Sequence, residues 1–449
     1  MVNTTRIPLP AWAVTLLGAV FLLLPACYNH YPMVDPDAGT YIASGFKLDT
    51  PMDRPITYGL LVRLLSINGL SLWGVVVVQA LLLSWLLQKV MQLVVGKFYS
   101  PLTGLFILLF LSQFTALPWL ACMIHPDIFT AVACLVLVLL LGSQRVGWWY
   151  YLLFWVAVAV HMSHPLLLAA VVLMLLVFRR SYARVSVRPV SYYFILIAIA
   201  FSAIAIMGSA ISKSKHVFFT GTLVEKGVLP VYLQEQCGHK NYRLCAYKDK
   251  LPKTSDAFVW LNDSPLYQVG DWAGSKAEFT EIDKDIMTTP RYLWMFIKAS
   301  AVQFYHQLNT FDIGTGTFRF QPGSNVHQQI SMYLPRERAS FECARQNLSD
   351  LPAALNWVNL LLRAIVYASA FALTWFIIAG WGSMPSALRL LVIVTIGGYI
   401  INCADFAALS TLIGRYSAKM VWLVPFTAIL CLYNAVNKDG VSTSKFIKQ

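Results

Sequence analysis

The residues of this chain whose types could carry out chemistry stand in four short motifs. The motifs are YPMVDPDAGTYIASG with Asp35 and Asp37, MIHPDIF with His125 and Asp127, HMSHP with His161 and His164, and LIGRYSAKM with Arg415 and Lys419. A carboxylate or an imidazole can take a proton from a hydroxyl group, and a guanidinium can bind two phosphate oxygens at once. Carboxylates and imidazoles are also metal ligands. The motifs therefore suit proton transfer, phosphate binding or metal binding.

Each motif also has a purely structural interpretation. DPDAG is a good turn sequence, and Asp127 could cap the first turn of a helix. Two histidines three residues apart share one helix face and could bind a metal, but histidines that form hydrogen bonds at a membrane interface are commoner. Arg415 and Lys419 could simply extend to phospholipid headgroups. The chemical interpretation gains strength only if the motifs lie on the same side of the protein.

The composition is that of a polytopic membrane protein. Of 449 residues, 58% are hydrophobic and 12% are charged, and the mean hydropathy is +0.62. Such a chain is too apolar for an ordinary soluble domain. The net charge of +13 could indicate a nucleic-acid partner, but the basic residues stand beside apolar runs, in FRRSYARVSVRP (178–189) and in the tail KDGVSTSKFIKQ (438–449). This pattern favours topology signals that face the cytoplasm, and no nucleic-acid partner is expected.

Apolar runs of bilayer length predict about ten transmembrane helices, with both ends of the chain in the cytoplasm. We interpret the first run as a retained span, and a secretory signal is the alternative. The short inside loops carry the Lys and Arg residues, as the positive-inside rule requires. The expected spans are 10–27, 71–94, 101–120, 127–143, 147–162, 164–178, 191–211, 354–379, 387–403 and 418–435.

This topology divides the chain into three parts. They are an N-terminal transmembrane module (1–211) with an acidic first exoplasmic loop (28–70), an exoplasmic domain (212–353), and a C-terminal transmembrane module with a basic cytoplasmic tail (354–449). We expect the exoplasmic domain to be α+β or irregular. Within it, residues 290–308 mix apolar and polar side chains, which predicts an amphipathic helix at the membrane interface, and residues 54–69 of the first loop predict the same.

Cys237 and Cys245 stand eight positions apart in CGHKNYRLC, inside the exoplasmic domain. The oxidising side of a membrane favours disulfides, so we predict that the two cysteines are joined. Two free thiols are the alternative. A metal site is weaker still, because only His239 is a nearby ligand and zinc sites usually present two close pairs.

On this topology the chemical motifs share the exoplasmic side. Ionisable groups near the hydrocarbon are costly and tend to line cavities or sites. Asp405, in NCADF, joins the four motifs on that side, whereas the span interiors are almost free of acidic residues. A proton pump would instead place acids along the span interiors. We therefore expect one polar cavity that opens outward.

The sequence resembles the GT-C-fold membrane glycosyltransferases that use polyprenyl-phosphate sugars. In that family, an acidic motif and a tyrosine follow the first span, and an RPxxYxxLL segment comes next. Here the pattern is Asp35, Asp37 and Tyr41, followed by DRPITYGLLVRLL (53–65). The late GRYSAKMVWLVPF is similar to the family's RYxxPxxP ending, although the first proline after the Arg-Tyr pair is Pro425. The resemblance covers about the first hundred and the last forty residues.

The resemblance implies a role for each motif. Asp37, four residues before Tyr41, would be the general base, and Asp35 would orient it or help bind a cation. Arg415, with Lys419 or Arg54 in support, would bind the lipid-linked phosphate, and in-line attack would invert the anomeric centre. A divalent metal, magnesium or manganese, could bind at His125 and Asp127. His161 and His164 would form hydrogen bonds to the acceptor or to headgroups.

The partners implied are a polyprenyl-phosphate-linked sugar donor, membrane lipids, and a glycan, lipid or protein acceptor. The expected place is the bacterial inner membrane, with the active site facing the periplasm. Three alternatives stay open: a lipid-linked glycan flippase or other transporter, a glycan polymerase or ligase of another fold, and an assembly subunit without enzymatic activity. A transporter would be expected to show internal repeats and broken helices near the midplane.

Overall fold

The chain is almost entirely helical. The computed structural model describes residues 9–182 and 188–446, with side chains up to residue 437. Within these residues it contains helices and no strand apart from an isolated bridge between Met33 and Met123. The all-α prediction is therefore confirmed. The middle of the basic segment 178–189 and the side chains of the basic tail lie outside the described residues.

Five helical stretches are long and apolar enough to cross a membrane. They are α1 with α2 (Ala11–Leu22, Leu24–Asn29), α5 (Trp73–Val95), α24 (Asn356–Gly380), α25 (Ser386–Leu409) and α26 with α27 (Gly414–Val421, Leu423–Phe446). A sixth span results if α12 (Val190–Ser202) and α13 (Ile204–Glu225), which bend by 52° at their junction, count as one. By length and composition, these are the helices of a polytopic membrane protein.

Four further apolar helices are too short to cross a bilayer core as straight helices. They are α6 (Pro101–Phe114), α8 (Ile128–Gly142), α9 (Trp148–Ala159) and α10 (His164–Val177). The longest, α8, has 15 residues, which at about 1.5 Å each gives about 22 Å, against about 30 Å of hydrocarbon. The polar motifs MIHPDIF and HMSHP form turns that shorten these helices. Of the ten expected spans, the structure therefore supports five directly.

The segment predicted as an α+β or irregular exoplasmic domain is helical, and it has two parts. The first part has its own apolar core, and its longer helices are α14 (Val228–Gln236), α15 (Ser255–Trp260), α18 (Lys276–Thr288) and α19 (Pro290–Asn309). The second part, 311–351, packs on the main core and, through α20 (Asn325–Tyr333), on α3 (Pro36–Lys47). The α+β alternative is wrong for the described residues. The boundary at 211 also falls inside α13, because the polar residues 212–215 end the apolar run without breaking the helix.

One local prediction in this segment is confirmed, and the interfacial position of residues 290–308 stays a prediction. Cys237 and Cys245 form a disulfide. Residues 290–308 form α19, which is absent from the helices long and apolar enough to span a membrane. Its side chains Trp294, Ile297 and Tyr305 are exposed. An exposed apolar face on a polar helix suits a position at the membrane interface.

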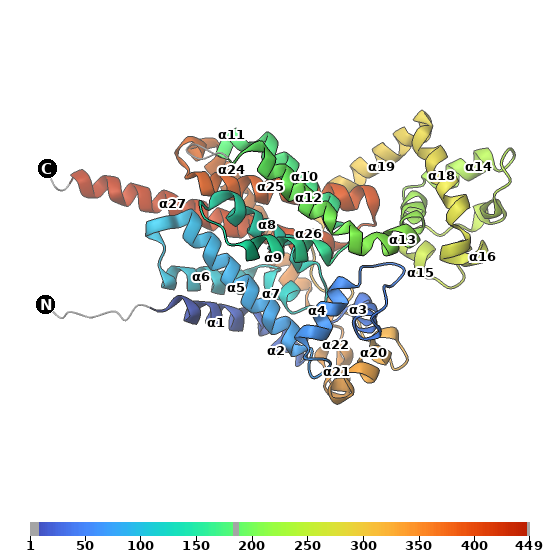
Figure 1. The fold of residues 1–449 in the computed structure, drawn as a ribbon, viewed down its shortest axis with the longest axis horizontal. Coiled ribbons are helices and arrows are strands. Elements are labelled where there is room, and N and C mark those ends of the chain that lie inside the picture. The colour runs from blue at the N-terminus through green and yellow to red at the C-terminus, as the bar shows by residue number, and fades with distance from the viewer. Residues whose placement is uncertain (1–8, 183–187, 447–449) are drawn as a thin grey trace.

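The helices form an elongated bundle whose two ends differ (Figure 1). The beginning of α1 and the end of α27 lie at one end, and α14, α15 and α18 lie at the other. Helix α8 runs through the interior, and every residue from Ile128 to Leu141 is buried. It packs against α5, α9 and α25. Since α8 starts directly after MIHPDIF, this motif is held inside the bundle.

Candidate functional site

A short backbone bridge joins two loops that are far apart in the sequence. The Met33 amide donates to the Cys122 carbonyl, and the Ile124 amide donates to the Met33 carbonyl, both at 2.9 Å. The Gln346 side chain holds the same loop by accepting from the Val34 amide at 3.2 Å and donating to its carbonyl at 2.6 Å. These bonds place the DPD motif beside the HPD motif.

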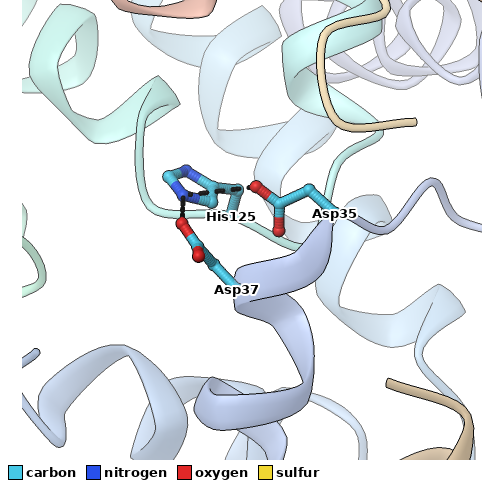
Figure 2. Close-up of side chains that lie close together, drawn as sticks. All are labelled: Asp35, Asp37 and His125. Atoms are coloured by element: carbon cyan, nitrogen blue, oxygen red, sulfur yellow. Dashed lines mark hydrogen bonds and ion pairs between the residues drawn. The ribbon is translucent and has the colours of Figure 1, made fainter. Parts of the chain in front are cut away.

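His125 is buried among three carboxylates. Its Nε2 lies 3.5 Å from Asp35 Oδ2 and 3.3 Å from Asp37 Oδ2. Figure 2 shows the two aspartates, at the start of α3, directed at the imidazole, which comes from a separate loop. On the other side of the ring, Nδ1 lies 3.3 Å from Asp127 Oδ2 and accepts a hydrogen bond from the Asp127 amide. The imidazole therefore links all the acidic residues of the two motifs.

Arg415 reaches the same three carboxylates from the N-terminus of α26. It forms an ion pair with Asp35, its Nη2 lies 3.4 Å from Asp37 Oδ2, and its Nε lies 3.2 Å from Asp127 Oδ2. A guanidinium presents several donors in a fixed plane, so it can serve several acceptors at once. The N-terminal and C-terminal motifs of the sequence resemblance thus meet at one point.

Two further cations complete the arrangement. Arg54 Nη1 lies 3.0 Å from Asp37 Oδ1, and its Nη2 lies 2.5 Å from Asp53 Oδ2. Lys419 Nζ lies 3.3 Å from Asp127 Oδ1. The charged cluster, as we call it, consists of Asp35, Asp37, Asp53, Asp127, His125, Arg54, Arg415 and Lys419. Before His125 is counted, four carboxylates face three cations, so the cluster nearly balances its own charge.

The two aspartates of the DPD motif are not equivalent. Asp35 is fully buried, and its Oδ1 caps α3 by accepting from the Ala38 amide at 3.1 Å. The Asp37 side chain is 29% exposed and lines a cavity. Burial raises the pKa of Asp37, but the charge of Arg54 and the interaction with His125 outweigh it, so the pKa lies well below its ordinary value. Asp37 is therefore an ionised carboxylate, at the surface of the cavity, throughout the ordinary pH range.

Close contact between α3 and α4 (Thr57–Leu65) supports this side of the cluster. A Cβ on Gly45 would lie 2.0 Å from the Gly59 carbonyl oxygen, so only glycine allows the two helices to approach this closely. The contact holds Tyr41 of α3 against the segment that precedes α4. There the Arg54 guanidinium lies 5.1 Å from the centre of the Tyr41 ring. Tyr41 therefore helps to orient Arg54 through a cation–π contact.

Asp35, Asp37 and His125 also form a candidate metal site. One ligand atom from each lies within 4.8 Å of the others. Two carboxylates and an imidazole suit manganese well and magnesium less well. The guanidinium of Arg415, however, contacts the same carboxylates, so a cation could bind only if Arg415 moves away from them. The set differs from the predicted pair of His125 and Asp127, because Asp127 is turned toward Arg415 and Lys419.

Four residues of the charged cluster line a cavity of about 1390 Å³. They are Asp37, Asp53, Arg54 and Arg415. Apolar side chains from several helices line much of the remainder, among them Leu166, Ile211, Phe219, Val259, Met287 and Leu409. The cavity therefore combines a charged region with many apolar side chains. Of the motifs singled out in the sequence, those with Asp37, His161 and Arg415 contribute to its lining.

The other predicted site residues differ in their position relative to the cavity. His164 is fully buried, and both ring nitrogens are bonded at 2.7 Å, to Thr130 and to the Ala157 carbonyl. It is therefore placed to hold α8, α9 and α10 together rather than to bind a substrate. His161 does line the cavity. Lys419 is completely buried behind the cluster, where it can support Arg415 through Asp127 but cannot contact a ligand in the cavity.

Sequence reasoning missed several residues of the site. Asp53 had a visible signal, since it stands next to Arg54 in DRP. Gln346 could not be recognised from the sequence, because the Val34 backbone that it binds is 312 positions away. Asp256 and Asp283 line the cavity from the mid-chain helices. Their isolated positions in a polar segment gave no pattern that could be recognised.

The chain matches no family model, no curated protein and no solved structure. The family resemblance therefore rests on the motifs alone. What the structure adds is that residues from both halves of that resemblance, Asp37 and Arg415, lie in one cluster.

Proposed function

We propose that this protein is a membrane glycosyltransferase of the GT-C type. It transfers a sugar from a polyprenyl-phosphate donor to an acceptor on the exoplasmic face, which in a bacterium is the periplasmic face of the inner membrane. The observation that supports this proposal is the cavity itself, whose lining combines Arg54, Arg415 and Asp37 with many apolar side chains. A polyprenyl phosphate has the same two parts, an anionic headgroup and an apolar chain.

In this proposal the two arginines bind the donor phosphate. A phosphate would replace the carboxylates of Asp35 and Asp37 as a partner of the Arg415 guanidinium. Buried guanidinium groups are well suited to the purpose, because they bind phosphate oxygens in pairs and are weakly hydrated. Their charge would stabilise the phosphate as it leaves.

Asp37 is the proposed base. The acceptor hydroxyl gives its proton to the Asp37 carboxylate, the acceptor oxygen bonds to the anomeric carbon, and the bond from that carbon to the phosphate oxygen breaks with its electron pair on the phosphate. Single in-line displacement inverts the anomeric centre. A low pKa makes Asp37 a weak base but keeps it ionised, and departure of a guanidinium toward the phosphate would raise its basicity.

A divalent cation held by Asp35, Asp37 and His125 would add positive charge beside the leaving phosphate. The arginines already supply positive charge there, so the proposal does not depend on a metal. Transfer that survives thorough chelation would exclude a role for the cation, and loss of transfer that manganese restores would establish one.

Binding of polyprenyl phosphate tests the donor site without knowledge of the sugar. We expect native mass spectrometry of the purified protein to detect the bound lipid phosphate. Arg415→Gln should weaken binding by about tenfold or more, because charge-assisted hydrogen bonds are lost. Arg54→Gln should weaken it as well, while Arg338→Gln, which removes an exposed ion pair with Glu342, should not. Equal binding by all four proteins, or no binding at all, would refute the proposed donor site.

One observation favours a second candidate, a lipid-linked glycan transporter. Helices α12 and α13 are bent against each other by 52°, and Ile211 and Ser214 of α13 line the cavity. Transporters often place such broken helices at their binding sites. A flippase would move the donor across a bilayer without cleaving it, so the fate of the sugar-phosphate bond separates the two functions. The same measurement distinguishes the proposed transferase from a polymerase or ligase that uses a different donor, because such an enzyme would leave this bond intact.

A further inference from the structure

The cavity has a second polar region, on the mid-chain helices. It lies on α13, α15 and α18, none of which contributes to the charged cluster. We call this region the distal wall, and its main residues are Thr222, Asp256, Trp260, Thr280, Asp283 and Lys284. The phosphate and the apolar chain of the donor have no chemical use for such a surface. The distal wall therefore offers polar and aromatic contacts to a group of different chemistry.

Trp260 gives the distal wall an aromatic surface. Trp260 lines the cavity and is 47% exposed. An edge contact with Phe218 and a tilted contact with Trp272, whose ring centres lie 6.1 and 5.7 Å away, hold it in place. A fixed, exposed indole offers a flat apolar face and one N–H donor to a ligand.

Asp283 gives the distal wall a carboxyl group with spare hydrogen-bonding capacity. Its Oδ1 accepts from Thr220 Oγ1 at 3.0 Å, and in the described part of the chain no cation forms an ion pair with it. Burial raises the pKa of Asp283 to about 8. Near neutral pH the carboxyl is therefore mostly protonated, and it can both donate and accept. A ligand hydroxyl would satisfy a group that is otherwise costly to bury.

Asp256 connects the distal wall to the charged cluster. It stands in the first turn of α15, and no hydrogen bond or ion pair of its carboxylate is found among the described residues. Burial raises the pKa of Asp256, and the charges of Glu225 and Asp37 raise it further. Asp256 and Asp37 line the same cavity. A ligand on the distal wall would therefore share this cavity with the proposed base.

The cavity is large enough for two ligands. Pockets for single drug-sized ligands measure roughly 300–1,000 Å³, and this cavity measures about 1390 Å³. A donor headgroup at the charged cluster leaves the distal wall free.

We propose that the distal wall is the acceptor site and that the acceptor is a carbohydrate. A sugar ring has one apolar C–H face, which fits Trp260, and a rim of hydroxyls, which fits Asp256, Asp283 and the threonines. This inference rests on the proposed transferase function. A lipid alone would leave the carboxyl groups unsatisfied, and a peptide bound as an added strand would need a sheet edge, which the helical wall does not offer.

A photocrosslinking experiment tests the acceptor class without knowledge of its identity. A benzophenone amino acid replaces Leu261, which lines the cavity beside Trp260 and is 53% exposed, in the full-length protein in its native cells. A matched control carries the same probe at Leu348, which is 64% exposed and belongs to α22 (Arg345–Leu348), outside the cavity. After irradiation, the adduct is analysed by mass spectrometry, in which fragment ions of sugars identify a carbohydrate.

We expect a carbohydrate adduct at position 261 that lacks polyprenyl phosphate, and no such adduct at 348. No adduct, a peptide or simple lipid adduct, or an adduct that still carries polyprenyl phosphate would overturn the inference. The last outcome would mean that the donor occupies the distal wall.

Variants of the distal wall separate this inference from the donor site. Asp283→Asn, introduced with the probe at 261, should lower the yield of the carbohydrate adduct about fivefold, because a hydrogen bond to the acceptor is lost. Polyprenyl phosphate binding should change less than twofold. Asp263→Asn, an exposed position outside the cavity, is the control. An unchanged adduct yield in Asp283→Asn would refute the role of Asp283. If the carbohydrate adduct forms but the protein binds no polyprenyl phosphate, the carbohydrate site stands and the proposed transferase function is refuted.

Discussion

The charged cluster and the distal wall are built on opposite principles. At the charged cluster, Asp35 and Lys419 are completely buried, and each charge has a partner within ion-pair distance. At the distal wall, Asp283 has one hydrogen bond, and no bond of Asp256 is seen in the described part of the chain. A paired, buried cluster holds charges in place before a substrate arrives, whereas an unpaired wall keeps its donors and acceptors for a ligand. The difference suggests a fixed catalytic region and an adaptable recognition region.

Loss of the cavity-facing carboxylate should have the largest effect. Asp37→Asn keeps the shape of the side chain but removes the proposed base, so release of polyprenyl phosphate from a sugar donor should fall by about 100-fold or more. Asp263→Asn should leave it unchanged. Because Asp37 is exposed to the cavity, the variant protein should still be made and folded, which size-exclusion chromatography checks. Full activity in the Asn variant would remove Asp37 from the mechanism.

The next effect concerns stability at the charged cluster. Lys419→Met leaves the buried Asp127 with fewer cations, and breaking a buried ion pair costs about 3–5 kcal/mol. The thermal unfolding midpoint should therefore fall clearly. Asp127→Asn combined with Lys419→Met should raise the unfolding midpoint part of the way back, because no unpaired charge is then left at position 127. Lys240→Met removes an exposed pair with Glu281 and should leave the midpoint where it was. Equal midpoints for Lys419→Met and Lys240→Met would contradict the account of a pre-formed cluster.

A smaller effect is expected where two helices support the cluster. Gly45→Ala places a methyl group against the Gly59 carbonyl, at 2.0 Å before any adjustment. Over-packing of this kind costs about 1–3 kcal/mol, and the displaced segment carries Arg54, so polyprenyl phosphate should also bind more weakly. Gly238→Ala, where no atom lies within 4 Å of the added Cβ, is the control. Unchanged binding would show that the helix contact does not position Arg54.

The smallest effect is a pH dependence at the distal wall. The folded protein holds the Asp283 proton up to about pH 8, whereas the unfolded chain releases it near the ordinary value of 3.8. Between these values the folded state binds the extra proton, so stability falls as the pH rises. Asp283→Asn removes this titrating group and therefore its contribution to the pH dependence of stability. The unfolding midpoint of the wild type should therefore decline relative to the variant between pH 5 and 8, and parallel curves would refute the raised pKa.

The sequence predicted those features that depend on local pattern. Apolar runs predicted the long membrane helices, and the spacing of Cys237 and Cys245 predicted the disulfide. The expectation that all four motifs line one outward cavity stays a prediction: Asp37, His161 and Arg415 line the cavity, whereas His125, Asp127, His164 and Lys419 are absent from its lining.

The rest depends on packing that no local pattern records. Lys419 was taken as a possible phosphate ligand, yet α26 turns it away from the cavity toward Asp127. Four expected spans form short helices, and polar motifs border three of them: α8 begins at the end of MIHPDIF, α9 ends before HMSHP, and α10 begins within HMSHP. Asp256 and Asp283 join the cavity through α15 and α18, which pack on α13 where this helix continues past its apolar run.

Cleavage of a donor is the most direct test of the central claim. Purified protein is incubated in lipid vesicles with a polyprenyl-phosphate hexose and an extract of cell-envelope glycans, and free polyprenyl phosphate is measured. The account predicts release by the wild type, and little or no release by Asp37→Asn or Arg415→Gln. An intact donor, or a donor that crosses the bilayer without losing its sugar, would contradict it.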